Sequence, residues 1–230
     1  MVKRFGTNYG GFYYPEDLKG LSSDSIVYCF GAGEDVSHDI EIATTLNSNV
    51  HIFDPTPRSR EHLNLVYSVI DDTSNVVMDN KIGGGDLSYW DYVLKTNIKK
   101  EQLKFYSYGV GSKSGLHKFY LPENLDHVSH SLISKDQNSS FIEVEIKDLT
   151  TIMQELGHAT LDLLKMDIEG SEFSVILDLL KNKIFPKYIA VEFHPNKTEE
   201  DFNLTIGSLL SKGYSLLHKQ NNDYTFSLNN

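Results

Sequence analysis

The sequence predicts an α/β fold: a doubly wound, mostly parallel sheet of seven strands with an antiparallel C-terminal hairpin and helices on both faces. Short apolar segments alternate with segments whose apolar residues recur at helical spacing, which is typical of consecutive βαβ units. Several of these apolar segments end in glycines or carboxylates, at the edge where ligands bind in such sheets. Asn221-Asn222-Asp223 is a hairpin signal between the last two apolar segments.

The first βαβ unit follows from local signals. Residues 25–30 are an apolar run that ends in a glycine turn, which predicts a strand. Residues 34–46 carry apolar side chains at helical spacing and predict a helix. Residues 50–53 predict a second strand, and Thr56 in the following turn can cap a helix over residues 58–70.

The middle of the chain is less regular. Three consecutive glycines at residues 83–85 forbid regular structure and predict an excursion before a short helix at residues 89–96. Alternation of apolar and polar residues predicts the strands that follow, at residues 103–110, 116–121 and 141–146. A helix is expected at residues 149–156.

The last third of the chain returns to the alternating order. Uninterrupted apolar runs predict buried strands at residues 161–166 and 188–191. The helix after the first of these carries its apolar side chains at Phe173, Val175, Ile176 and Leu179. A helix over residues 199–212 and two strands, at residues 214–217 and 224–228, complete the predicted fold.

A single domain over residues 1–230 is expected, because 230 residues with 40% hydrophobic composition suffice for one core. Residues 1–24 are interpreted as an N-terminal extension. Its aromatic and glycine cluster at residues 9–14 is too short for a pair of strands, and Tyr9 could close over a ligand. Residues 71–100 and 111–140 are interpreted as insertions that shape the binding site.

Charge and cysteine content exclude several classes of protein. Lys and Arg total 21 against 32 Asp and Glu, and a net charge of -11 repels polyanions, so no nucleic-acid partner is expected. Cys29 is the single cysteine and cannot form an internal disulfide, which fits a reducing compartment. No apolar run approaches a membrane span, and we expect a cytoplasmic protein without a membrane partner.

The glycine turn after the first strand is the first candidate binding element. Gly31 and Gly33 allow the backbone to approach a ligand closely. Val36 replaces the third glycine of the dinucleotide fingerprint, and Glu34 and Asp35 at the helix start disfavour a pyrophosphate. A cofactor that carries positive charge suffers no such repulsion.

Asp54 is the second candidate binding element. It lies about 20 residues beyond the glycine turn, at the end of the second strand, where a carboxylate can accept hydrogen bonds from ribose hydroxyls. The alternative is that Asp54 only forms an Asp-Pro turn. A glycine turn combined with a distant carboxylate favours the binding role.

Acidic residues crowd the ends of the two later buried strands. Asp167, Glu169 and Glu172 follow one of them, and their repulsion is best explained by a cation or a proton donor in the site. Acids that suit the dipole of the next helix are the alternative. Of Glu192 and His194, which follow the other strand, only one is expected to reach the pocket. A divalent metal bridging Asp167 with Glu169 or Glu192 is conceivable, but the spacing does not favour it, and no metal is predicted.

These segments resemble the FkbM family of S-adenosylmethionine-dependent methyltransferases, which have the class I, Rossmann-like fold, and the similarity runs through nearly the whole chain. Residues 31–39 look like the first cofactor loop of that family in its GxGED form, and residues 51–57 are similar to its second-strand signature. Residues 164–172 look like its Lys-x-Asp-x-Glu-Gly-x-Glu motif, and residues 191–194 are similar to its next strand end.

The resemblance implies S-adenosylmethionine as cofactor and S-adenosylhomocysteine as product. It implies that Gly31, Gly33 and Glu34 flank the methionine end, that Asp54 holds the ribose and that Asp167 lies near the transferred methyl. Many class I enzymes carry an acid just before the first glycine, and since this chain does not, Glu34 or Asp39 is expected to supply the charge. The residues expected at the cofactor are Gly31, Gly33, Glu34, Asp39, Asp54, Thr56, Gly109 and Asp167.

The resemblance also implies O-methylation of a hydroxyl on a small molecule or a sugar. The acceptor hydroxyl must lose its proton, and Asp167 or His194 is the candidate general base, although His194 could equally be structural. An NAD(P)-dependent oxidoreductase and a non-catalytic cofactor-binding or interaction module are the alternative functions. The sequence identifies neither the acceptor nor the oligomeric state.

Overall fold

The main sheet has seven strands and is mostly parallel, as the sequence predicts. A computed structural model describes residues 1–75, 87–120, 141–194 and 198–229. The spatial order of the strands is β11 (Tyr214–Gln220), β12 (Asp223–Leu228), β10 (Tyr188–Glu192), β9 (Leu163–Met166), β3 (Val27–Phe30), β4 (Val50–Phe53) and β5 (Leu103–Tyr106). The strands from β10 to β5 in this order run parallel. β12 is antiparallel to both β10 and β11.

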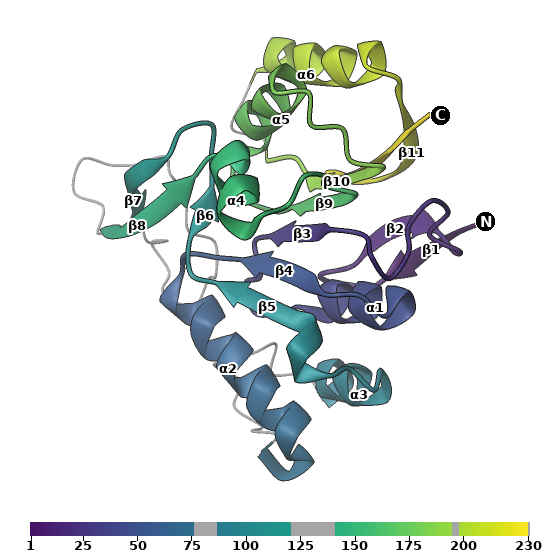
Figure 1. The fold of residues 1–230 in the computed structure, drawn as a ribbon, viewed down its shortest axis with the longest axis vertical. Helices are drawn as coiled ribbons and strands as arrows, with labels where there is room; N and C mark the ends of the chain where they lie inside the picture. The colour runs from purple at the N-terminus through teal and green to yellow at the C-terminus, as the bar shows by residue number, and fades with distance from the viewer. Residues whose placement is uncertain (76–86, 121–140, 195–197, 230) are drawn as a thin grey trace.

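Helices pack on the two faces of this sheet through separate clusters of apolar side chains. The helices are α1 (Ser37–Leu46), α2 (Pro57–Asp71), η1 (Thr73–Asn75), α3 (Leu87–Lys95), η2 (Lys100–Gln102), α4 (Leu149–Leu156), α5 (Glu172–Lys181) and α6 (Glu199–Ser211). Val27 and Cys29 of β3 share a cluster with α1, α2 and α3, while Tyr28 and Phe30 share the other with α4, α5 and α6. Figure 1 shows α2 and α3 at the β5 end of the sheet and α5 and α6 at the β11 end.

Capping residues set the starts of several helices. The Thr56 side chain accepts a hydrogen bond from the Ser59 N–H, and Pro57 occupies the first turn of α2. Thr198 and Asp201 form a capping box at the start of α6. No helix among the described residues is long and apolar enough to cross a membrane.

The segment predicted as one strand at residues 103–110 forms two strands in different sheets, which corrects that prediction. The main-sheet strand β5 ends at Tyr106, and β6 (Gly109–Val110) pairs with β8 (Phe141–Lys147) in a small sheet that also contains β7 (Gly115–Tyr120). A Cβ atom at Gly109 would lie 2.7 Å from the Ile146 Cδ1 atom and 3.3 Å from the Pro55 Cγ atom. The chain therefore leaves the main sheet at a point where a larger residue would require the Ile146 side chain to move.

The N-terminal residues form a strand pair that the sequence analysis did not predict, and residues 9–14 supply only part of its second strand. β1 (Val2–Phe5) and β2 (Phe12–Pro15) are antiparallel. Phe5, Phe12 and Tyr14 are buried in the same cluster as Val27 and Cys29 of the main sheet. The hairpin is stable despite its short strands because the rest of the domain buries its side chains.

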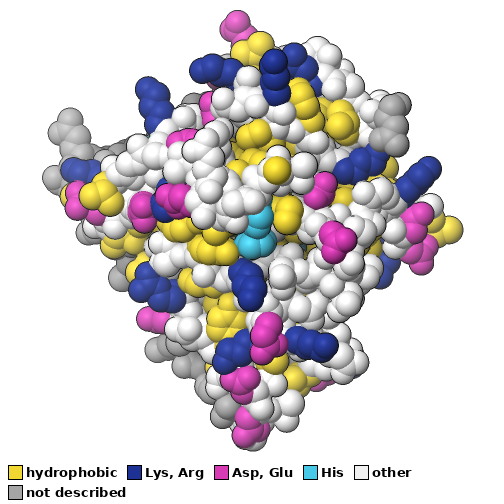
Figure 2. All heavy atoms as spheres, viewed as in Figure 1, with side chains coloured by type: hydrophobic (Ala, Val, Ile, Leu, Met, Phe, Trp, Pro, Cys, Tyr) yellow, Lys and Arg dark blue, Asp and Glu magenta, His cyan; other side chains and the backbone are white. Residues whose placement is uncertain are grey.

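The two predicted insertions are described only in part. Residues 76–86 and 121–140 lie outside the described residues, and these include the three consecutive glycines and most of the segment expected to shape the binding site. Figure 2 shows one face of the molecule, on which Lys and Arg side chains are interspersed with Asp and Glu rather than gathered in one patch.

Acid should destabilise the fold through His62. This side chain is fully buried in α2, and its Nε2 atom lies 2.8 Å from the Tyr89 hydroxyl. Burial lowers the pKa of His62 from 6.5 to about 4, against a smaller opposing effect of Asp35. Between these two values the unfolded chain takes up a proton that the folded chain does not. The free energy of unfolding should therefore fall as the pH drops from 6.5 to 4, by about 3 kcal/mol for this residue.

Urea unfolding over this pH range tests the expectation. His62→Gln keeps a group able to hydrogen bond to Tyr89 but cannot titrate, so its stability should fall less than that of the wild type below pH 6.5. The two proteins should show the same pH dependence above that value. Parallel curves across the whole range would contradict the assignment to His62.

Candidate functional site

A cleft of about 490 Å³ lies at the carboxyl ends of β3, β4, β9 and β10. This is the edge at which parallel sheets bind ligands, and the volume suits a small organic molecule. The residues predicted from the sequence that line the cleft are Gly31, Gly33, Glu34, Asp54, Thr56, Gly109, Asp167 and His194. Asp39 is the one predicted residue that does not line it.

The glycine turn forms the floor of the cleft. Gly31 has a φ of 83°, and a Cβ atom there would lie 1.8 Å from the Asp167 carbonyl oxygen. Gly33 has a φ of 50°, but a Cβ atom there would contact no atom of the described residues within 4 Å. Gly31 is therefore required by a backbone contact as well as by its conformation, whereas Gly33 is favoured by conformation alone.

Asp54 joins the two binding elements inferred from the sequence. Its Oδ2 atom accepts hydrogen bonds from the backbone N–H groups of Ala32 (2.9 Å) and Gly33 (3.2 Å). Its Oδ1 atom accepts from the Thr56 N–H (2.8 Å) and the Thr56 hydroxyl (2.6 Å). Asp54 is only 5% exposed. The carboxylate thus fixes the shape of the glycine turn and holds it against the end of β4.

Two ion-pair and hydrogen-bond contacts position the acids that follow the turn. The Arg58 guanidinium donates to both carboxylate oxygens of Glu34, at 2.5 and 3.0 Å. The Asp35 carboxylate accepts from the Thr7 hydroxyl (2.5 Å) and from the Ser37 N–H (2.8 Å). The hydrogen bond from Thr7 to Asp35 connects the N-terminal hairpin to the segment that precedes α1.

The loop of that hairpin forms one wall of the cleft, which sequence reasoning foresaw only for Tyr9. The wall residues are Asn8, Tyr9, Gly10, Gly11 and Phe12. Tyr9 lines the cleft with 80% of its surface exposed. Asn221 and Asp223 at the C-terminal hairpin also line the cleft and were likewise missed. Turn residues carry no pattern that indicates what they face.

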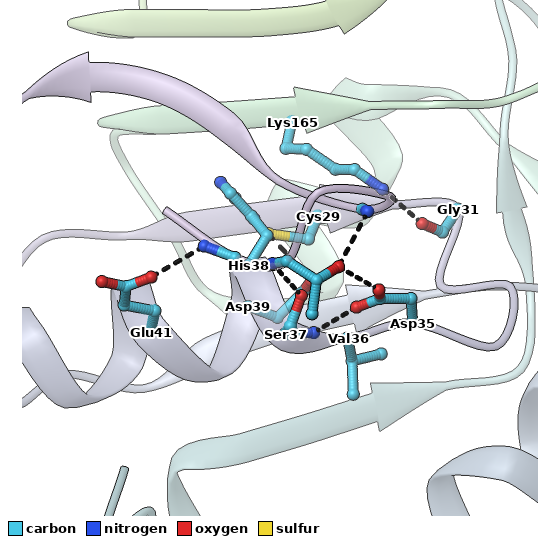
Figure 3. Close-up of polar contacts among 12 residues, drawn as sticks. Cys29, Gly31, Asp35, Val36, Ser37, His38, Asp39, Glu41 and Lys165 are labelled. Carbon is cyan, nitrogen blue, oxygen red and sulfur yellow. Dashed lines mark hydrogen bonds and ion pairs between the residues drawn. The ribbon is translucent and has the colours of Figure 1, made fainter. Parts of the chain in front are cut away.

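A buried polar cluster lies beneath the glycine turn (Figure 3). Lys165 is 4% exposed, and its Nζ atom donates to the Gly31 carbonyl oxygen at 2.5 Å. Asp39 is 2% exposed, and its carboxylate lies 3.7 Å from the His38 Nδ1 atom. The structure therefore places Asp39 beneath the glycine turn, where it does not line the cleft.

Charge compensation explains how this cluster remains ionised. Burial alone lowers the pKa of Lys165, but the charges of Asp167, Asp39 and Asp54 outweigh it and raise the pKa. Burial alone raises the pKa of Asp39, but His38 and Lys165 together lower it. The sequence analysis assigned no role to Lys165. Its signal was a charge inside the otherwise apolar strand β9.

Acidic side chains surround His194 at the end of the cleft. Its Nδ1 atom lies 2.8 Å from the Glu172 Oε1 atom, and its Nε2 atom lies 3.3 Å from Glu169 Oε2 and 3.9 Å from Asp167 Oδ1. Glu192 and His194 both line the cleft. The expectation that only one of them reaches it is wrong, because residues two apart in an extended chain share a face.

The electrostatics of this end are dominated by negative charge. Burial alone lowers the pKa of His194, but the hydrogen bond to Glu172 and the charges of Glu172, Glu169 and Asp167 raise it to about 9. Burial, then the charge of Asp167, raises the pKa of Glu192 to about 7. His194 therefore carries a proton at neutral pH in this environment, which argues against the general-base role predicted for it.

Comparison with known protein families gives one finding. A family model described as the methyltransferase FkbM domain matches residues 27–216. The match extends from β3 through α6 and includes the glycine turn, Asp54 and the acidic strand ends, while β1 and β2 precede it. Searches of the curated proteins and of the solved structures found no match.

Proposed function

This chain belongs to the FkbM methyltransferase family, and we propose that it transfers a methyl group from S-adenosylmethionine to a hydroxyl of a small molecule or sugar. The observation that carries the proposal is the direct contact between the glycine turn and Asp54 at the floor of a cleft. A strand order with the switch point between β3 and β9, and an antiparallel C-terminal β12–β11 pair, supports a doubly wound class I methyltransferase sheet.

The lining of the cleft suits S-adenosylmethionine better than a nucleotide with phosphates. Asp35, Asp167 and Glu192 line the cleft, and their negative charge attracts a sulfonium and an ammonium group. The same carboxylates repel a pyrophosphate, which argues against the nicotinamide-dependent alternative. In this proposal Gly31, Gly33 and Glu34 flank the methionine end of the cofactor.

Asp54 remains the proposed partner of the ribose, together with Thr56 and Gly109. Its two carboxylate oxygens already accept four hydrogen bonds, which accounts for about four lone-pair sites. A ribose hydroxyl must therefore replace one of these donors. The Thr56 hydroxyl is replaced at least cost, because it also lies 2.8 Å from the Ser59 hydroxyl, to which it can donate instead.

When bound, S-adenosylmethionine supplies a methyl group on a sulfonium, and S-adenosylhomocysteine remains after transfer. The part of the protein is to hold the acceptor oxygen in line and to take up the proton that it loses. Asp167 and His194 close the end of the cleft, 3.9 Å apart, and we place the acceptor hydroxyl beside them. The carboxylates around this point provide the base.

Calorimetric titration with S-adenosylhomocysteine and, separately, with NADH tests the cofactor. We expect S-adenosylhomocysteine to bind with a dissociation constant in the range of about 1 to 100 μM and NADH to give no heat. Asp54→Asn, which is similar in size but has one acceptor oxygen fewer, should weaken binding about 10-fold or more. Heat from NADH and none from S-adenosylhomocysteine would overturn the proposal.

Transfer of a labelled methyl group to a panel of sugars and small hydroxylated molecules tests the reaction. Label is expected on a hydroxyl oxygen of at least one acceptor. Cofactor binding without transfer to any member of the panel would favour the non-catalytic module instead. A net charge of -11 repels polyanions, and an RNA acceptor in the same panel should take up no label.

A further inference from the structure

The acceptor end of the cleft has the arrangement of a metal centre. We propose that Asp167, Glu192 and His194 bind one divalent cation of the Mn²⁺ or Mg²⁺ class. One ligand atom from each of the three residues lies within 4.8 Å of the others, and all three residues line the cleft. Ligand atoms at 2.0 to 2.6 Å from a common cation are separated by about this distance or less.

The sheet brings the three ligands together. β9 and β10 are parallel neighbours in which Met166 pairs with Val191. Glu192 ends β10 and Asp167 directly follows β9, so the two residues lie side by side at this edge of the sheet. His194 lies two residues beyond Glu192 and shares its face. The sequence analysis predicted no metal, because this register could not be read from the sequence.

A second carboxylate orients His194 as a metal ligand. Glu172 is fully buried, and its Oε1 atom accepts from the backbone N–H groups of Ile168 (3.3 Å) and Gly170 (3.0 Å). The same atom lies 2.8 Å from His194 Nδ1, so the Nε2 atom faces Glu169 (3.3 Å) and Asp167 (3.9 Å). Metal-binding histidines almost always donate their other N–H to a carboxylate, carbonyl or water.

A buried carboxylate oxygen without a hydrogen-bond partner is the independent sign of a missing cation. The Glu172 Oε2 atom is buried and has no hydrogen-bond partner among the described residues. Asp223 also lines the cleft and adds a further carboxylate to this end. The Lys165 ammonium, which is bonded to the Gly31 carbonyl, supplies only one positive charge near Asp167. A divalent cation would offset the carboxylates and displace the proton on His194.

The donor set indicates the class of metal and its role. Two carboxylates and one imidazole, without cysteine, suit Mn²⁺ or Mg²⁺ better than a softer metal. Three protein ligands leave positions open for water and for the acceptor hydroxyl. On the proposed function, a cation here would hold the acceptor oxygen and ease the loss of its proton. Asp167 and His194 would then be ligands instead of bases.

Electron paramagnetic resonance of Mn²⁺ tests the site without cofactor or activity. The full chain is freed of metal with a chelator and titrated with MnCl₂, and loss of the free Mn²⁺ signal should saturate at one ion per chain. Glu192→Gln and His194→Ala should each weaken binding at least about 10-fold, and Glu172→Gln about 10-fold. Asp223→Asn is the matched control, because it removes a carboxylate of the same cleft that is not a ligand. It should change the affinity less than about 3-fold.

Each outcome decides the proposal. Absence of saturable Mn²⁺ binding overturns it, and so does an Asp223→Asn effect as large as those of the ligand variants, which would mean a diffuse acidic surface. Circular dichroism identifies any variant that fails to fold, and Glu172→Gln then still tests the oriented imidazole. A chain that binds S-adenosylhomocysteine but not Mn²⁺ refutes the metal site alone. Mn²⁺ binding without S-adenosylhomocysteine binding supports the metal site and refutes the proposed function.

Discussion

Gly31→Ala should reduce the affinity for S-adenosylhomocysteine by about 100-fold or more, whereas Gly33→Ala should reduce it less than about 10-fold. Both glycines have positive φ angles in the same turn, so both substitutions strain the backbone by about 1 kcal/mol. Only at Gly31 would the new Cβ atom meet backbone, the Asp167 carbonyl oxygen at 1.8 Å. The turn and the end of β9 must separate to admit it.

Calorimetry and thermal unfolding of the two variants measure this difference. Gly33→Ala controls for the loss of glycine flexibility, because its Cβ atom has open space. We expect Gly31→Ala to show the larger loss in melting temperature as well, since the contact with Asp167 joins β3 to β9. Equal affinities in the two variants would mean that this contact does not shape the binding site in solution.

The parts of the site that sequence predicted are those with a local cause. The glycine turn must be glycine because of its backbone, and Asp54 ends a strand whose apolar run is visible in the sequence. The contact between the glycine turn and Asp54 depends on the pairing of β3 with β4. A sequence pattern predicts the order of strands and helices along the chain, but it does not show directly which strands pair. Helices and strands of the main sheet were therefore predicted well, and distances within the site were not.

The elements that the sequence analysis missed are stabilised by residues distant from them in the sequence. β1 and β2 are only four residues each, and the side chains that bury them come from other elements. The Tyr14 hydroxyl lies 2.9 Å from His38 Nε2, and the Tyr14 ring packs edge-on against Tyr188. At the break between β5 and β6, Gly109 lies close to Pro55 and Ile146. Neither contact leaves a periodic signal.

Asp39 was predicted to supply negative charge at the cofactor, but its carboxylate lies beneath the glycine turn and does not line the cleft. The sequence lacks an acid just before the first glycine, and Asp39 was a reasonable substitute near the turn. The structure uses its charge below the turn, where it balances Lys165. The buried lysine in β9 was the better clue, because a charge in a buried strand needs a partner of opposite sign.

Lys165→Met should lower the free energy of unfolding by about 3 to 5 kcal/mol, and Asp39→Asn should lower it by less. Methionine fills a similar volume but leaves the carboxylate of Asp39 buried beside His38 alone. Removal of Asp39, in contrast, leaves Lys165 with Asp167 and Asp54 as compensating charges. Loss of Lys165 therefore leaves a buried charge without its partner, whereas loss of Asp39 does not.

The double variant Lys165→Met/Asp39→Asn separates this explanation from simple loss of packing. It should be more stable than Lys165→Met, because it no longer contains the uncompensated carboxylate, and urea unfolding measures the difference. Affinity for S-adenosylhomocysteine should fall in both variants that lack Lys165, because the Gly31 carbonyl then loses its hydrogen bond. In Asp39→Asn the affinity should stay within about 3-fold of wild type. Additive losses of stability, or a cofactor effect of Asp39→Asn as large as that of Lys165→Met, would contradict the coupling of this buried pair to the glycine turn.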